Sequence, residues 1–317
     1  MKNTYKYLIS LALAVCMLLT IAACGESKPD QNTEQNTEQQ TEQTEAPVIL
    51  TETAPEGVAI GTIAAAATPV ERFATHPALL LWESDVPGAP AVAPTLIPYL
   101  TEEAKGTIIL LQGIDAQGSG YYISEGAPVA EHLNGLGYDV FICKYRITQS
   151  FSDDVTGDVR RAVRFVNFYS EEFGLGTQRI ALMGFGTGGL LSFIEDCDNE
   201  IGKSAEGIDA MSAEVRATIM VNTDIKVTEG MFAGAAPQNT PNRKHYFGVF
   251  YEQGSPDVSE LMMYFHDLKN DAFFGSGGTI EYHSIIGVDG YEAGGNRTVE
   301  YDSMYDMLVN FLEEYIF

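Results

Sequence analysis

The hydrophobic residues of this chain fall into short blocks separated by amphipathic stretches. Within most blocks the apolar residues are consecutive rather than alternating, which is typical of strands in a parallel sheet covered on both faces. The pattern predicts strands at 107–111, 139–143, 179–183, 217–221, 246–251 and 280–286.

The stretches between these blocks have helical patterns. Over 153–173, apolar residues recur at the spacing of one helix face. Ser152 or Asp153 can cap the start of this helix, and Gly174 can end it. Alternating strands and helices predict an α/β protein with a doubly wound, mostly parallel sheet flanked by helices, in which ligands bind at the carboxyl ends of the strands. Further helices are predicted at 126–137, 259–271 and 302–317.

The N-terminal end has the plan of a secretory signal peptide over residues 1–23. Lys2 and Lys6 precede an apolar run that ends in the residues IAAC. This ending resembles the lipobox of bacterial lipoproteins. The resemblance implies cleavage before Cys24 and lipidation of its thiol, which would anchor the protein to the membrane of a bacterial envelope, outside the cytoplasm. The alternative is an ordinary signal peptide that happens to be followed by a cysteine.

Residues 24–47 are almost free of apolar side chains and repeat Asn-Thr-Glu and Gln-Thr-Glu units. Such a segment cannot bury enough surface to offset the entropy lost on ordering, so we predict a disordered tether. The remaining residues, 48–317, contain no internal linker and are predicted to form one domain.

Charge and cysteine content narrow the possible partners. The 18 Lys and Arg residues face 44 Asp and Glu residues, giving a formal net charge of −26. An acidic surface repels phosphate backbones, which argues against a nucleic-acid partner.

With Cys16 in the signal peptide and Cys24 lipidated, Cys143 and Cys197 are too few for a disulfide scaffold. The apolar surroundings of Cys143 predict a buried thiol.

Six segments from residue 79 onwards carry a more specific pattern. They read LLLWESDVPGAP (79–90), PTLIPYL (94–100), EGAPVAEHLNGLGYDVFICKYRI (125–147), GDVRRAVRFVNFY (157–169), RIALMGFGTGG (179–189) and IDAMSAEVRATIMVN (208–222). In this order they resemble bacterial acetyl esterases and acetyl-xylan esterases of the α/β-hydrolase superfamily. The resemblance implies an α/β-hydrolase fold that needs no cofactor. It also implies a serine on a turn after a strand, an oxyanion loop after an earlier strand, and an acid and a histidine after late strands.

The residues at the catalytic positions depart from this family pattern. Gly186 stands where the family has its nucleophilic serine, and Asp289 stands where it has its histidine. Asp257 or Glu252 would be the acid after the strand at 246–251, although neither aligns cleanly. Because loss of the nucleophile and the base leaves at most residual catalysis, we predict a degenerate, esterase-like protein.

The segment in place of the oxyanion loop, QGIDAQGSGYY at 112–122, lacks the histidine and the glycine triplet of the family. Its Asp115 would oppose a developing oxyanion. We expect the former active-site cleft to bind an acylated carbohydrate or another ligand instead. The residues expected to line this cleft are Gly113, Asp115, Ser119, Tyr121, Tyr122 and Thr187.

Two other functions remain open. One is an active carboxylic-ester hydrolase, of the carbohydrate-deacetylase type, with an unusual catalytic set drawn from Thr187, Ser119, His283 and the loop acids. His283 lies within a predicted strand, where a packed or edge histidine is the simpler interpretation. The other function is a structural or assembly protein whose cleft is closed.

A metal site is a further alternative for the acidic residues. Asp115, Asp257 and Asp289 could converge at the carboxyl edge of the sheet, and clustered carboxylates bind Ca²⁺ or Mg²⁺. Their spacing matches no known metal loop, so we expect ordinary solvated loop acids and no metal.

Overall fold

The computed structural model describes residues 50–62, 74–83, 86–88, 90–115, 117–148, 153–175, 179–196, 207–223, 245–252, 279–286 and 299–317. The chain divides into two compact units, Met1–Ala46 and Pro47–Phe317, and the described residues all belong to the second. The predicted signal peptide and tether, with Cys24, lie outside the described residues. So do the predicted helix at 259–271 and the positions of Asp257 and Asp289.

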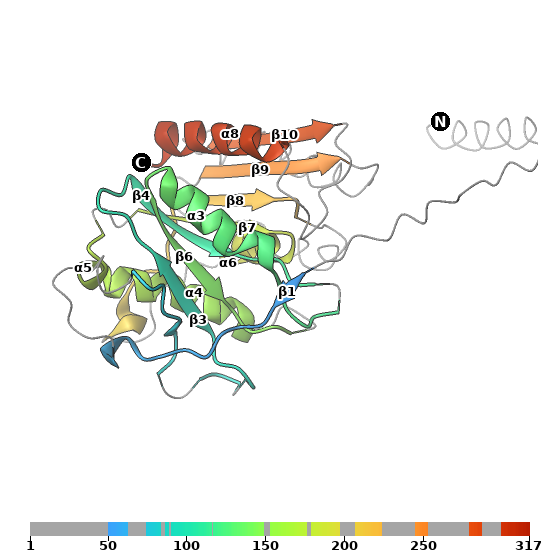
Figure 1. The fold of residues 1–317 in the computed structure, drawn as a ribbon. Coiled ribbons are helices and arrows are strands. Elements are labelled where there is room, and N and C mark those ends of the chain that lie inside the picture. The colour runs from blue at the N-terminus through green and yellow to red at the C-terminus, as the bar shows by residue number, and fades with distance from the viewer. Residues whose placement is uncertain are drawn as a thin grey trace, which may run out of the picture. The chain divides into compact units, whose positions relative to one another are not determined.

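An eight-stranded sheet forms the centre of the second unit (Figure 1). Neighbouring strands run parallel from β10 to β6, whereas β3 is antiparallel to β6 and β2 is antiparallel to β3. This confirms the predicted, mostly parallel sheet. In spatial order the strands are β10 (Thr279–Ile286), β9 (His245–Glu252), β8 (Ala217–Val221), β7 (Ile180–Phe185), β4 (Gly106–Leu111), β6 (Tyr138–Lys144), β3 (Thr95–Tyr99) and β2 (Leu79–Leu80).

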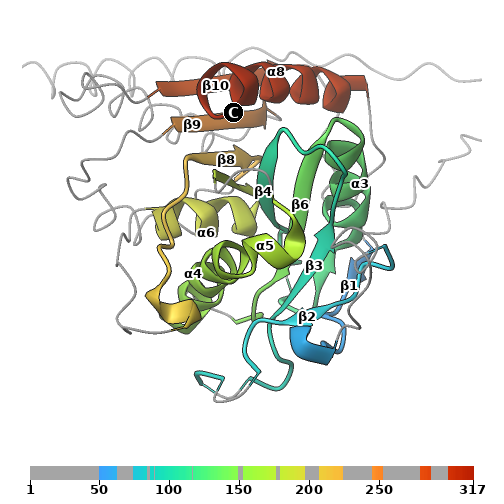
Figure 2. The same ribbon diagram turned by 90° about the vertical axis from the view of Figure 1, so that its left-hand side faces the viewer.

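Helices cover both faces of this sheet, as Figure 2 shows. On one face lie α3 (Ala127–Gly135) and α8 (Val299–Tyr315), and on the other lie α4 (Asp153–Phe168), α5 (Ser170–Phe173) and α6 (Thr187–Asp196). The helix predicted at 153–173 is two helices, because Tyr169 leaves the helical region with a ψ of 22°. Gly174 ends α5 in the left-handed conformation, with a φ of 72°.

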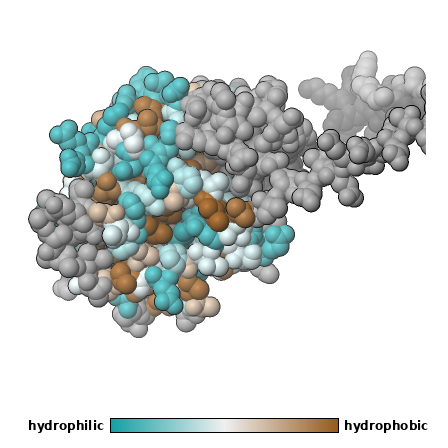
Figure 3. All heavy atoms as spheres, viewed as in Figure 1, coloured by the Kyte–Doolittle hydropathy of each residue, from teal (hydrophilic) through white to brown (hydrophobic). Residues whose placement is uncertain are grey.

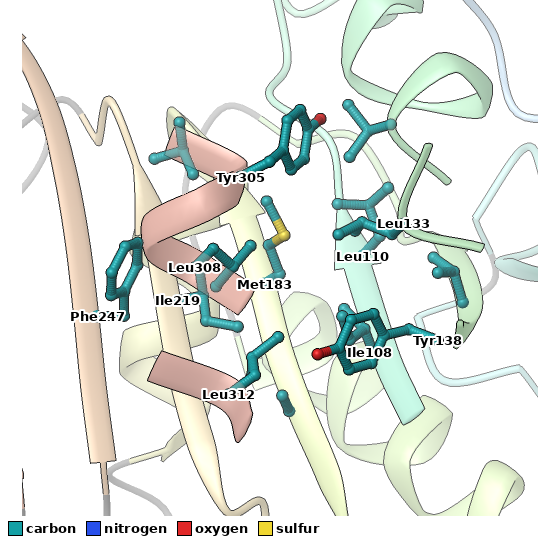
Figure 4. Close-up of a cluster of buried hydrophobic side chains, with 14 of the residues drawn as sticks. Ile108, Leu110, Leu133, Tyr138, Met183, Ile219, Phe247, Tyr305, Leu308 and Leu312 are labelled. Atoms are coloured by element: carbon teal, nitrogen blue, oxygen red, sulfur yellow. The ribbon is translucent and has the colours of Figure 1, made fainter. Parts of the chain in front are cut away.

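The consecutive apolar residues of the strands supply two hydrophobic layers. Ile108 and Leu110 point to the layer under α3 and α8, and Ile109 and Leu111 point to the layer under α4. Figure 4 shows the first layer, where Leu308 and Leu312 of α8 meet Met183 and Ile219 of the sheet. Because both faces are covered, strands such as β4 are buried at every position, as their sequence predicts. Cys143 is a free, buried thiol in the second layer, also as predicted, and burial raises its pKa.

The sequence pattern does not reveal the short elements at the start of the domain. The segment of β3 includes Pro98, which argues against a strand. However, β2 pairs only with Thr95 and Leu96, so Pro98 lies in the part of β3 that has a neighbour on one side alone, in β6. A separate two-stranded sheet joins β1 (Thr51–Glu52) to β5 (Tyr121–Tyr122). The described residues also form three short 3₁₀ helices, η1 (Ile60–Thr62), η2 (Ile123–Glu125) and η3 (Ile208–Ala210).

The coloured surface in Figure 3 mixes hydrophilic and hydrophobic residues, and the apolar atoms form small separate groups. None of the helices in the described ranges combines the length and the hydropathy that a bilayer crossing requires.

Candidate functional site

Two turns meet at the carboxyl edge of the sheet, where the sequence places the site. Strands β4 and β7 are parallel neighbours with Leu111 paired to Gly184, so the loop after β4 lies next to the turn after β7. That turn is Gly186, whose N–H donates a hydrogen bond to the carbonyl oxygen of Val221 at the end of β8 (3.0 Å). The structure therefore brings the predicted nucleophile position and the predicted oxyanion loop together.

Gly186 is the single residue between β7 and α6, and its backbone has a φ of 48°. Residues other than glycine are strained at this positive φ, and the nucleophile of a nucleophile elbow sits on a turn with the same kind of strain. A Cβ atom placed on Gly186 would meet no atom of the described residues within 4 Å. The position thus has the backbone of a nucleophile elbow and is not crowded by the described residues, but it carries no side chain.

The neighbouring glycines are fixed by close contact. A Cβ on Gly184 would overlap the backbone of Gly188, and one on Gly188 would overlap the carbonyl oxygen of Leu111 and approach that of Gln112 to 2.8 Å. A Cβ on Gly189 would lie 2.9 Å from the oxygen of Gly184. These three positions need glycine so that α6 can approach the sheet. Gly186 is under no such packing constraint.

Thr187, the first residue of α6, holds the loop after β4 onto the helix. Its Oγ1 accepts a hydrogen bond from the N–H of Ile114 (2.8 Å), and its side chain also hydrogen-bonds Tyr145. The phenol of Tyr145 in turn donates to the carbonyl oxygen of Gln112 (2.7 Å). In the described part of the chain no imidazole contacts Thr187, so none of the described histidines is placed to act as the base that a nucleophile needs.

Six backbone N–H groups of the loop after β4 are already hydrogen-bonded within the protein. An oxyanion hole in this kind of site takes one N–H from the residue after the nucleophile and one from this loop. The acceptors are Glu125 Oε2 for Gly113, Thr187 Oγ1 for Ile114, Gly120 O for Asp115, Asp115 Oδ1 for Gln117 and Ser119, and Asp115 O for Gly118. Each of these N–H groups would have to leave its partner before it could stabilise an oxyanion.

Glu125 makes the same loop electrostatically unsuited to an oxyanion. Its side chain is only 2% exposed and accepts the N–H of Gly113 at 2.7 Å. A buried carboxylate beside the loop repels a developing negative charge, and it does so more strongly at low dielectric than in water. The predicted opposition to an oxyanion thus has a second source in Glu125, which the sequence did not indicate.

Asp115 and Ser119 form a closed turn rather than a reactive pair. The Asp115 carboxylate accepts the N–H groups of Gln117 and Ser119 at 2.9 Å each, and the Ser119 hydroxyl at 2.5 Å. Burial raises the pKa of Asp115, but the hydrogen bonds from Ser119, Gln117 and Gly118 outweigh burial and lower the pKa overall. A carboxylate with a lowered pKa is a weak base, so it does not activate Ser119 as a nucleophile.

The two adjacent tyrosines differ in their access to the cleft. Tyr121 is fully buried, and its hydroxyl donates to the carbonyl oxygen of Tyr145. This corrects the prediction that Tyr121 lines the cleft, because alternation along β5 turns it into the core. Tyr122 is half-buried, and its carbonyl oxygen accepts the side-chain N–H of Gln112 (2.7 Å).

His283 lies on β10, the edge strand of the sheet, and not at the elbow. Its Nε2 is 2.6 Å from Glu281 Oε1 on the same strand, and its ring packs against Phe247. The described residues contain no group of three or more His, Cys, Asp or Glu side chains that could hold a metal ion.

Sequence reasoning also missed a buried polar cluster beneath the loop. Lys144, at the end of β6, is only 2% exposed and donates to the Glu52 carboxylate and to Gln112 Oε1. Burial lowers the pKa of Lys144, and the contact with Glu52 opposes this shift. The available signal was a lysine directly following the apolar run of β6, because a charge at such a position needs a partner.

A family model described as BD-FAE, an α/β-hydrolase family, matches residues 103–239. The matched region includes the loop after β4 and the Gly186 turn, and it covers less than half of the 317 residues. No curated protein matches the sequence significantly.

Solved structures with a similar fold include esterases. One is an acetyl ester-xyloside bifunctional hydrolase from Caldicellulosiruptor lactoaceticus, which is 20% identical with a TM-score of 0.62 over 75% of this chain and 96% of that chain. Another is esterase 2 from Thermogutta terrifontis phosphoramylated by tabun, which is 15% identical with a TM-score of 0.56 over 76% and 95% of the two chains. The chain has the α/β-hydrolase fold, as its sequence predicts.

The glycine contacts give a test of the elbow. Gly188→Ala should lower the free energy of unfolding by about 3 kcal/mol or more, because its methyl group overlaps the carbonyl oxygen of Leu111. Gly186→Ala should cost only about 1 kcal/mol, from its positive φ alone. Urea denaturation of the two variants measures both values. A Gly186→Ala variant that is as unstable as Gly188→Ala would contradict the conclusion that a side chain at position 186 is not crowded.

Proposed function

We propose that this chain is a lipid-anchored protein of the bacterial envelope whose esterase-like domain binds a ligand without hydrolysing it. The observation that carries this proposal is Gly186, which has the positive φ of a nucleophile position and is not crowded by the described residues, but has no side chain to attack a carbonyl. The occupied N–H groups of Gly113 and Ile114 support it independently, because they remove transition-state stabilisation as well as the nucleophile.

The proposed ligand is an acylated carbohydrate. Buried Glu125 and the Asp115 carboxylate, whose pKa is lowered, make this edge of the sheet unfavourable for anions, which favours a neutral ligand such as a sugar. No described residue comes within 4 Å of a Cβ at Gly186, which favours a small acyl group at this position. The structurally similar hydrolase from Caldicellulosiruptor lactoaceticus is an acetyl ester-xyloside bifunctional hydrolase, which supports the same chemical class.

The hydrogen bonds of Thr187 and Ser119 argue against an active esterase that uses either residue as its nucleophile. Thr187 is tied to Ile114 and Tyr145, and Ser119 is tied to a weakly basic carboxylate.

A serine-directed fluorophosphonate probe tests the loss of catalysis on the full-length chain purified in detergent. We expect no labelling, and hydrolysis of aryl acetates no faster than that of a Gly186→Ala variant. Acetylated xylo-oligosaccharides should raise the melting temperature, and chemically deacetylated ones should not.

Labelling that is lost in Thr187→Ala or Ser119→Ala would establish the active-esterase alternative in place of this proposal. If neither form of the oligosaccharide shifts the melting temperature, the proposed ligand class is wrong.

Thr187 also limits any restored activity. In a Gly186→Ser, Asp289→His background, adding Thr187→Ala should speed fluorophosphonate labelling at least about tenfold, because it frees the N–H of Ile114. Adding Thr187→Ser, which keeps the hydroxyl, should leave the labelling rate unchanged. Equal rates for the two additions would show that Thr187 does not restrain the loop.

The proposed lipid anchor depends on Cys24. A Cys24→Ser variant expressed in a bacterial host should leave the membrane fraction and fail to incorporate radiolabelled palmitate, because no thiol remains to be acylated. A Cys16→Ser variant, altered within the predicted signal peptide, is the control and should stay in the membrane fraction. Palmitate incorporation into Cys24→Ser would rule out this anchor.

A further inference from the structure

The first described residues of the domain pair with the end of the loop after β4. Within residues 50–58, here called the strap, Thr51 pairs with Tyr122 and Glu52 pairs with Tyr121 in antiparallel register. The N–H of Ile123 also donates to the carbonyl oxygen of Leu50 (3.3 Å). At its other end, the strap reaches β2 through a bridge between Val58 and Leu79. The strap therefore joins the former oxyanion loop to an edge of the main sheet.

Glu52 connects this strap to the interior of the domain. Its carboxylate accepts hydrogen bonds from Lys144 Nζ and from Gln112 Nε2, the latter at 3.0 Å. Lys144 and Gln112 are buried, whereas the Glu52 side chain is 37% exposed. A partly exposed residue of the strap is thus the counter-ion of a buried lysine, and its loss would leave that charge unpaired.

Gln112 links Glu52 to the loop through hydrogen bonds to both. Its side-chain amide donates to the carbonyl oxygen of Tyr122 (2.7 Å) as well as to Glu52, and its Oε1 accepts from Lys144. The fit is tight, since a Cβ on Gly126 would come within 2.5 Å of Gln112 Nε2. A Cβ on Gly120 would likewise come within 2.7 Å of the carbonyl oxygen of Glu52. The strap and the loop therefore cannot move independently without breaking these contacts.

We propose that the strap controls the conformation of the cleft wall, with Glu52 as its positioning residue. When Glu52 is in place, residues 112–122 keep the closed hydrogen-bonding pattern that occupies the N–H groups of Gly113 and Ile114. Lifting the strap removes the partner of Lys144 and releases Gln112, and the loop then opens. The inference rests on the proposed function in taking this loop as a wall of the ligand site, and its source of control rests on the proposed membrane anchor.

The strap lies close in sequence to the predicted tether, so events at the N-terminal side of the domain can act on the loop through it. The strap begins at Leu50, three residues after the predicted tether ends at residue 47. A pull on the membrane anchor, or a partner that binds the start of the domain, would act on the strap before any other described element.

Hydrogen exchange measured by mass spectrometry on the full-length chain in detergent tests the coupling without relying on any catalytic activity. Glu52→Gln should speed exchange of the amides within 112–122 at least tenfold and leave peptides from α4 at the wild-type rate. Glu56→Gln is the matched control, because it removes the same charge from an exposed position of the same strap and should change neither region.

Wild-type exchange of 112–122 in Glu52→Gln would overturn the proposal. Where that variant exchanges faster everywhere, the comparison moves to Glu52→Ala with Lys144→Met, which removes the unpaired buried charge together with the oxygen that accepts from Gln112. This double variant should exchange faster than wild type in 112–122 alone. Wild-type exchange there would also overturn the proposal, and neither result depends on whether the cleft binds carbohydrate.

Discussion

The site depends on how closely α6 approaches the sheet. The helix begins one residue after β7 ends, and the contacts of Gly184, Gly188 and Gly189 leave no room for a Cβ between the helix and strands β7 and β4. This approach sets the sharp turn at Gly186. It also brings Thr187 within hydrogen-bonding distance of Ile114, so one packing constraint fixes both the empty nucleophile position and the closed loop beside it.

Several interactions, and not one substitution alone, support the proposed loss of catalysis. The attacking side chain is missing at Gly186, the loop donors are bound to Glu125 and Thr187, and a buried carboxylate stands next to the loop. Each of these interactions also stabilises the folded protein, because it satisfies a backbone N–H or shapes a turn. A polar group that serves the fold in this way is not available to a transition state.

The sequence predicts the parts of this structure that arise from local patterns. Strands β4, β6 and β7 are visible as apolar runs, and the glycine spacing around Gly186 indicates the turn after β7. The contacts that close the site are long-range. Ile114 and Thr187 are 73 residues apart, and Glu52 and Lys144 are 92 residues apart. No periodicity connects such pairs, so the roles of Thr187, Glu125 and Glu52 emerge only once the strands are placed side by side.

The glycine contacts have a consequence for recognising inactive members of such a fold. Gly184, Gly188 and Gly189 preserve the turn for reasons of packing alone, and those reasons are the same whether a serine or a glycine lies between them. The elbow pattern can therefore persist long after hydrolysis has been lost, since selection for a stable fold is enough to maintain it. In proteins of this architecture, these glycines indicate how closely the helix packs on the sheet. Only the residue at the elbow position shows whether a nucleophile is present.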